Sequence, residues 1–159
     1  MIRKIKIQKP KMPISLNNCD DAINEILDYE KLEEALVENT TIDGIENLSV
    51  SLNSCIFKSV VFKNCLGRYS NFAFSKFSGV SIENSDFSFA VFQEIKNETL
   101  LLDSNNLTKS VFTGTSLNNV DFTNSDIDGI EVRLKDVYGG TFSANQALDL
   151  SKLMGISIK

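Results

Sequence analysis

The chain has 159 residues, a hydrophobic fraction of 42% that is ordinary for a folded protein, a net charge of −5 and no histidine. It is long enough for one domain with a hydrophobic core, and it has no apolar run of transmembrane length. The lack of histidine removes the commonest general base and a common metal ligand. We therefore expect neither a catalytic site nor a metal or other cofactor.

Residues 1–39 form a first region with two parts. Residues 1–11 carry five basic residues and no acid, and their alternating "IRKIKI" predicts a strand that pairs with the next part of the fold. A membrane-surface or nucleic-acid arm is the alternative interpretation. Residues 20–37, "DDAINEILDYEKLEEALV", have apolar residues at helical spacing after Asp20 and Asp21, which predicts an acidic capping helix. The basic start lacks the apolar core of a secretory signal, so we expect a cytoplasmic location.

Residues 40–142 repeat every five residues. Every fifth position from 42 to 132 is Ile, Leu, Val or Phe, except at Asn47, Gly67 and Asn97. A second column, two residues earlier, holds mostly small or β-branched residues without charge. Five matches neither the helical period of 3.6 nor the strand period of 2. A spacing of five fits a short extended segment with two inward side chains, followed by a polar corner. Repetition of this unit gives a coil whose turns stack at about 4.8 Å.

The coil predicts an interior of stacked apolar side chains. Its predicted members are Leu52, Phe57, Phe62, Phe72, Phe77, Ile82, Phe87, Phe92, Leu102, Leu107, Phe112, Leu117, Phe122, Ile127 and Val132. The three cysteines, Cys19, Cys55 and Cys65, include no CxxC pair, and we expect buried, reduced thiols.

The units "CIFKS", "SNFAF", "SDFSF", "SVFTG", "VDFTN" and "SDIDG" resemble those of the bacterial pentapeptide-repeat family, over about residues 40–142. The resemblance implies an all-β solenoid, a right-handed quadrilateral β-helix with four units per coil. Residues 20 apart would then stack, which turns Phe72, Phe92 and Phe112 into a ladder of rings.

Residues 143–159 predict a C-terminal capping helix and tail. Ser143 followed by Gln146 is a capping-box pattern, and Gly155 is a suitable stop. The segment resembles the C-terminal helix of many bacterial pentapeptide-repeat proteins. In the topoisomerase-protecting members that end forms the dimer, so the resemblance implies a possible homodimer through this helix.

The outward positions hold the candidate contact surface. Tyr69, Phe74 and Phe89 lie two residues after an interior position, and an aromatic patch there suggests either a partner or cover by the N-terminal arm. The acidic candidates are Glu83, Asp86, Asp121, Asp126, Asp128 and Glu131. Corner carboxylates are also common as solvated turn formers.

These features favour a non-enzymatic protein–protein interaction module. The resemblance implies one specific version, a DNA mimic that modulates DNA gyrase or topoisomerase IV, as in quinolone-resistance proteins. The alternative is a structural or assembly protein with an unknown partner and no topoisomerase role. The acidic surface argues against direct nucleic-acid binding, which requires cationic contacts to phosphates.

Overall fold

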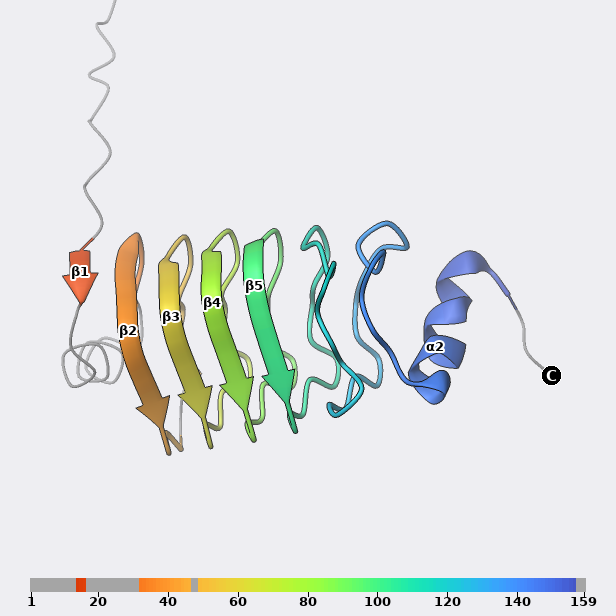
Figure 1. The fold of residues 1–159 in the computed structure, drawn as a ribbon, viewed down its shortest axis with the longest axis horizontal. Helices are drawn as coiled ribbons and strands as arrows, with labels where there is room; N and C mark the ends of the chain where they lie inside the picture. The colour runs from red at the N-terminus through yellow and green to blue at the C-terminus, as the bar shows by residue number, and fades with distance from the viewer. Residues whose placement is uncertain (1–13, 17–31, 47–48, 157–159) are drawn as a thin grey trace, which may run out of the picture.

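The computed structural model describes residues 14–16, 32–46 and 49–156, and its main part is a coil of parallel strands (Figure 1). One sheet contains β1 (Ile14–Leu16), β2 (Ala35–Asp43), β3 (Ile56–Lys63), β4 (Lys76–Glu83) and β5 (Lys96–Asp103) in sequence order. Each of β2, β3 and β4 pairs with the strand that follows it after one circuit of the chain. The predicted β-solenoid is therefore confirmed.

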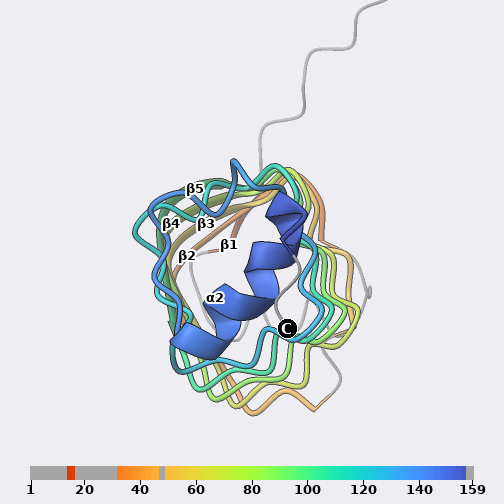
Figure 2. The ribbon, with the colours of Figure 1, turned by 90° about the vertical axis from the view of Figure 1, so that its right-hand side faces the viewer.

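The circuit is 20 residues long. Phe57 pairs with Phe77 and Ile82 with Leu102, and away from the strands isolated bridges keep the same spacing, as between Val91 and Val111. Twenty residues at five per segment give four sides, and the view along the axis shows this cross-section (Figure 2). Left-handed backbone recurs at the corners, for example at Ser59 with φ 53° and Gly79 with φ 71°.

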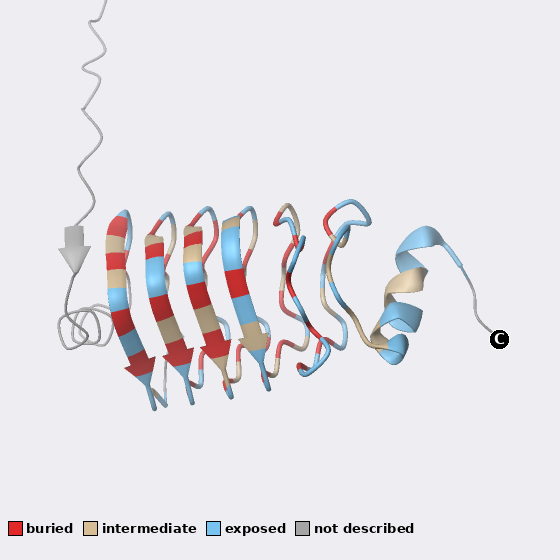
Figure 3. Cartoon of the chain, in the orientation of Figure 1, coloured by how far each residue is buried: buried red, intermediate tan, exposed pale blue. Residues whose placement is uncertain are grey.

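Buried residues alternate with more exposed ones along the strands of the coil (Figure 3), and the buried hydrophobic residues form one core cluster. Leu102 is half-buried, and the other predicted interior residues are all buried. Phe92 stacks between Phe72 and Phe112, with ring centroids 5.1 and 4.7 Å away and interplanar angles of 4° and 16°. Gly67 breaks the apolar column because a Cβ there would overlap the ring of Phe87. The spacing of five therefore places one apolar side chain on each inner wall.

The second column forms hydrogen bonds between coils, which the sequence pattern did not predict. The Asn105 amide donates to the carbonyl of Ile82 at 2.7 Å and accepts from the backbone N–H of Ser85 at 3.0 Å. The Cys55 and Cys65 thiols donate to the carbonyls of Leu32 and Ile42. Both thiols are free and buried, as predicted, and burial raises the pKa of Cys55 to about 11. Cys19 lies outside the described residues.

The N-terminal predictions are only partly within the described residues. The basic strand at residues 2–7 and most of the helix at 20–37 lie outside them, but the end of that helix is wrong, because β2 begins at Ala35. Leu32, Ala35 and Val37 are buried in the coil. Leu32 and Val37 extend the five-residue register backwards, and pairing with β3 prevails over the helical propensity of "LEEALV".

The C-terminal helix is confirmed as α2 (Ala144–Leu150), and a 3₁₀ turn over Ser151–Met154 follows it. Ser143 and Gln146 form the predicted capping box, and Gly155 ends the turn with φ 70°. The Gln146 amide also donates to the carbonyls of Phe122 and Ser125, at 2.9 and 2.8 Å. This ties the helix across the end of the coil (Figure 2). No helix in the described ranges is long and apolar enough to cross a membrane.

Candidate interaction surface

One side of the coil carries no charge over three successive circuits. We call it the neutral side and define it by the residues that flank its inner wall, which are the half-buried Asn71, Val91, Gln93, Val111 and Thr113 and the buried Ala73. Its inner wall is the ladder of Phe72, Phe92 and Phe112. This ladder of stacked rings supports the wall from the inside.

The predicted aromatic residues line the two edges of the neutral side. Tyr69 and Phe89 lie at one corner and Phe74 at the other, with 63%, 39% and 59% of their surfaces exposed. All three have left-handed backbone, with φ between 59° and 61°. Left-handed backbone is unfavourable for bulky side chains, by roughly 1–2 kcal/mol per residue. These positions therefore combine exposed apolar surface with backbone strain.

The corner of Tyr69 and Phe89 forms a short stack along the coil axis. The two rings lie 5.0 Å apart with an interplanar angle of 20°, as the 20-residue spacing predicts. On the far side of Phe89, the Lys109 ammonium lies 5.3 Å from the ring centroid. Both faces of the Phe89 ring are thus covered, one by a ring and one by a cation.

Most acidic candidates lie on two adjacent sides, which we call the acidic half. Glu83 and Asp121 are on one of these sides, and Asp86, Asp126 and Asp128 are on the other, while Glu131 lies at the end of the neutral side. The acidic half contains eight acidic residues, Asp43, Glu46, Glu83, Asp86, Asp103, Asp121, Asp126 and Asp128, and three basic ones, Lys63, Arg68 and Lys109. Its net charge is therefore 3 − 8 = −5.

Several of these carboxylates also hold turns. Asp121 accepts from the backbone N–H and the hydroxyl of Thr123 at 2.8 and 2.7 Å, and these bonds lower the pKa of Asp121. Burial alone would raise the pKa of Asp86, but bonds from Ser88 and the ion pair with Arg68 at 2.7 Å outweigh it and lower that pKa. Asp86 and Asp121 therefore stabilise turns of the chain and also contribute negative charge to the acidic half.

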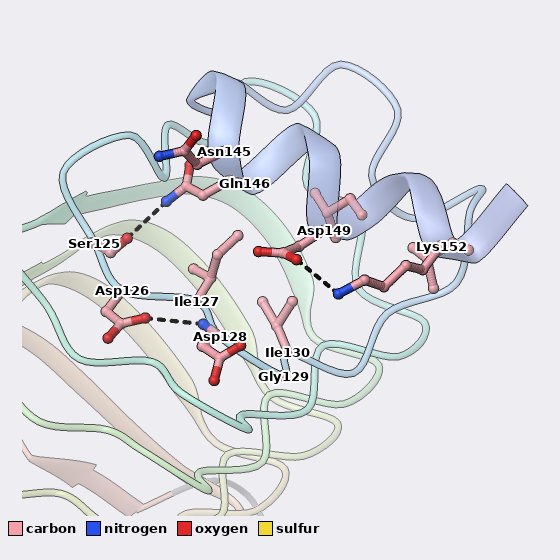
Figure 4. Close-up of a pocket in the computed structure, with 12 residues that line it drawn as sticks. Ser125, Asp126, Ile127, Asp128, Gly129, Ile130, Asn145, Gln146, Asp149 and Lys152 are labelled. Atoms are coloured by element: carbon pink, nitrogen blue, oxygen red, sulfur yellow. Dashed lines mark hydrogen bonds and ion pairs between the residues drawn. The ribbon is translucent and has the colours of Figure 1, made fainter. Parts of the chain in front are cut away.

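A pocket of about 430 Å³ lies between the last part of the coil and α2 (Figure 4). Ile127, Ile130, Leu150 and Leu153 supply its apolar walls, and Asp126, Asp128 and Asp149 its carboxylates. Asp149 is paired with Lys152 at 2.8 Å, and Asp126 accepts from the backbone of Asp128 at 3.0 Å. Two of its three carboxylates therefore take part in local interactions.

A second pocket, of about 480 Å³, lies beside Tyr69 and was not foreseen from the sequence. Its walls are Glu46, Ser49, Leu66, Arg68 and Tyr69. Leu66 is 49% exposed at an outward position of the repeat, where most residues are polar. This apolar residue was the feature of the sequence that could have indicated the pocket. No group of three or more metal-ligating side chains occurs among the residues that the structure describes.

Comparisons with known proteins find a family model that matches part of the coil, and solved structures of low sequence identity. The family model "Pentapeptide repeats", in 8 copies, matches residues 102–130, and a comparison with curated proteins finds no match. The pentapeptide repeat protein Rfr23 from the cyanobacterium Cyanothece 51142 is 13% identical, with 79% of this chain and 100% of that chain covered and a TM-score of 0.44.

Two structures of QnrB1, a plasmid-mediated fluoroquinolone resistance protein, are also similar. A trypsin-treated form is 17% identical over 93% of this chain and 99% of its own, with a TM-score of 0.26. The full-length form is 14% identical over 91% and 99%, with a TM-score of 0.22. Over residues 102–130 the family model confirms the resemblance stated from the sequence: this part of the coil consists of pentapeptide repeats.

Proposed function

We propose that this protein is a non-enzymatic module that binds another protein through the neutral side and its aromatic edges. The observation that supports the proposal is the exposure of Tyr69, Phe74 and Phe89 in left-handed backbone. A serine or asparagine would serve a solvated corner at lower cost. Strained, exposed aromatic residues on a rigid scaffold suggest a role in recognition.

The surrounding surface suits a protein partner. The core of a protein interface is poor in charge, and its binding energy is concentrated in buried aromatic and arginine anchors. The neutral side supplies uncharged surface between two aromatic corners, and the coil beneath it orders that surface in advance. A preformed surface reduces the entropy lost on binding.

A capture experiment tests this proposal. The full chain and a variant with Tyr69→Ser, Phe74→Ser and Phe89→Ser are immobilised, and bound proteins from an extract of the source cells are quantified by mass spectrometry. We expect the variant to lose at least nine-tenths of a partner that the unchanged chain retains.

The matched control carries Leu101→Ser and Tyr138→Ser, which alter side chains that are 59% and 83% exposed on other sides of the coil. It should retain the partner. Equal recovery by the aromatic variant, with its circular dichroism unchanged, would show that the aromatic edges do not make the contact.

A second candidate is a DNA mimic that modulates DNA gyrase or topoisomerase IV, and the acidic half supports it. Carboxylates on a rigid rod can imitate the phosphates of a duplex electrostatically. A cytoplasmic location belongs to this proposal, as does a homodimer through the C-terminal helix. Exposed Leu148, Leu153, Met154 and Ile156 on and after that helix support the homodimer.

A supercoiling assay with purified gyrase tests the DNA mimic. We expect inhibition, or protection from a quinolone, at micromolar protein. Glu46→Gln, Glu83→Gln and Asp128→Asn together should weaken the effect at least tenfold, because they remove three charges from the acidic half. A control with Glu94→Gln, Glu98→Gln and Glu131→Gln removes three charges elsewhere and should change it less. No effect of the unchanged protein on either reaction would favour the alternative, a structural or assembly protein without a topoisomerase role.

A further inference from the structure

Among the residues that the structure describes, no ring or cation covers the second face of Tyr69. The Tyr69 ring contacts Phe89 through one face, and because the rings are nearly parallel, the other face points towards the preceding circuit. Glu46 and Ser49 of that circuit line the pocket of about 480 Å³ with Leu66, Arg68 and Tyr69. We call this the Tyr69 pocket. An exposed aromatic face, an aliphatic side chain and a carboxylate thus meet around one hollow.

The charges around the Tyr69 pocket favour a cation. Arg68 donates from Nε to Asp86 at 2.7 Å, so its charge is compensated. Glu46 is exposed and makes no hydrogen bond or ion pair with any other described residue. The carboxylate of Glu46 therefore remains available to an incoming positive group.

The same corner already holds one cation. Lys109 places its ammonium over Phe89 at the closed end of the stack, at 5.3 Å from the ring centroid. Aromatic rings attract cations through the negative potential of their faces, and tyrosine and phenylalanine both do so. The open face of Tyr69 is the equivalent position at the other end of the stack.

We propose that the Tyr69 pocket binds the guanidinium group of an arginine side chain from the partner protein. A guanidinium is planar, so it can stack on the ring of Tyr69 while its N–H groups donate to Glu46. Its methylene groups can pack on Leu66, as long basic side chains often do. This inference rests on the proposed protein-binding function and specifies the chemistry of one contact in it.

Peptide binding to the full chain tests the inference without the partner. The probes are acetyl-Gly-Arg-Gly-amide and the same peptide with citrulline, which keeps the shape but lacks the charge. Each is titrated to millimolar concentration while the ring signals of Tyr69 are followed by NMR; the chain has only 3 tyrosines. We expect the arginine peptide to shift these signals and to bind at least fivefold more tightly than the citrulline peptide.

Variants assign the binding to this pocket. Tyr69→Ala, followed through the signals of the peptide, and Glu46→Gln should each weaken the arginine peptide about fivefold or more. Tyr138→Ala and Glu131→Gln alter an exposed tyrosine and an exposed acid elsewhere and should leave it unchanged. Equal binding of the two peptides, or no effect of Tyr69→Ala, would overturn the inference.

The basic N-terminal segment is the competing occupant. A full-length variant with Arg3, Lys4, Lys6, Lys9 and Lys11 changed to Gln removes its charge. If the arginine peptide binds only to this variant, the chain's own segment fills the pocket, and the proposal of a partner arginine is wrong.

The peptide experiment and the capture experiment can contradict their two proposals independently of each other. Suppose that partner capture depends on Phe74 but not on Glu46, and that the protein does not bind the arginine peptide. These results would support the proposed function and overturn this inference. Peptide binding together with capture that is insensitive to all three aromatic residues would contradict the proposed function.

Discussion

Replacing Phe92 with alanine is expected to lower the free energy of unfolding by about 3–5 kcal/mol, the range for a buried phenylalanine. Phe92 is fully buried in the middle of the ring ladder. Its ring stacks on Phe72 and Phe112 and meets the edges of Phe77 and Phe87, with centroids 6.5 and 6.1 Å away. Alanine would leave a cavity whose walls are fixed by interstrand pairing, so the site can collapse only a little.

Urea denaturation followed by circular dichroism measures this effect. Phe92→Leu keeps an apolar side chain and much of the volume, and it should lose clearly less stability than Phe92→Ala. Phe74→Ala removes a ring of the same size from an exposed corner and should change stability by less than about 0.5 kcal/mol. A Phe92→Ala variant within about 1 kcal/mol of the unchanged protein would mean that the ladder is not the main source of stability.

Replacing Asp136 with alanine is expected to cost about 2 kcal/mol at neutral pH. Only 6% of Asp136 is exposed, and its carboxylate accepts from the backbone N–H of Gly114 at 2.9 Å. It also accepts from the Arg133 guanidinium, at 2.8 Å from Nε and 3.1 Å from Nη2. The carboxylate thus joins two neighbouring circuits, and alanine would leave the Gly114 N–H without its acceptor. Because Arg133 is half-exposed and solvent screens its charge, we expect a much smaller loss of stability than for a fully buried ion pair.

The effect of Asp136 should depend on pH. Burial alone would raise its pKa, but the bonds from Arg133 and Gly114 outweigh burial, so the pKa in the folded protein is lowered. A lowered pKa stabilises the fold above the unfolded value of about 3.9, and this contribution is lost as the pH falls towards the folded pKa. The stability difference between the unchanged protein and Asp136→Ala should therefore be constant from about pH 5 to 7 and shrink below about pH 4.

Urea titrations of the two proteins at pH 7 and pH 3 measure that difference. The control is Asp149→Ala, which breaks an exposed ion pair with Lys152 and should have little effect at either pH. A difference that stays the same at pH 3 would show that the charge of Asp136 does not contribute to stability.

The interior was predictable because every five-residue unit of the coil points the same position inward. Phe72, Phe92 and Phe112 occupy equivalent positions, so a single rule placed all of them on inner walls. The same rule placed Tyr69 beside Phe89, since 20 residues make one circuit. Ser143 and Gln146 were predictable for another reason, because a capping box is satisfied within one turn of chain.

The start of the coil was harder to predict, since "LEEALV" is rich in residues that favour helices. Leu32 and Val37 nevertheless continue the register, and pairing of β2 with β3 decides their conformation. The hydrogen bonds of Asn105 and the carboxylate bridge of Asp136 were missed because their partners lie about one circuit away. A single unit of sequence does not reveal such partners.

The sequence by itself determined the five-residue register, the coil with its apolar interior and the capped C-terminal helix, because each depends on spacing along the chain. The four sides of the coil were implied by the resemblance to pentapeptide-repeat proteins. Only the tertiary structure decided which groups the acidic side chains contact, as in the ion pair of Asp86 with Arg68 and the bond from the Gly114 N–H to Asp136. It also decided that Tyr69 and Glu46 line the same pocket. The physical reason is that separation along the chain indicates which outward residues become neighbours, but the bonds between them form only when successive circuits stack and fix the side-chain conformations.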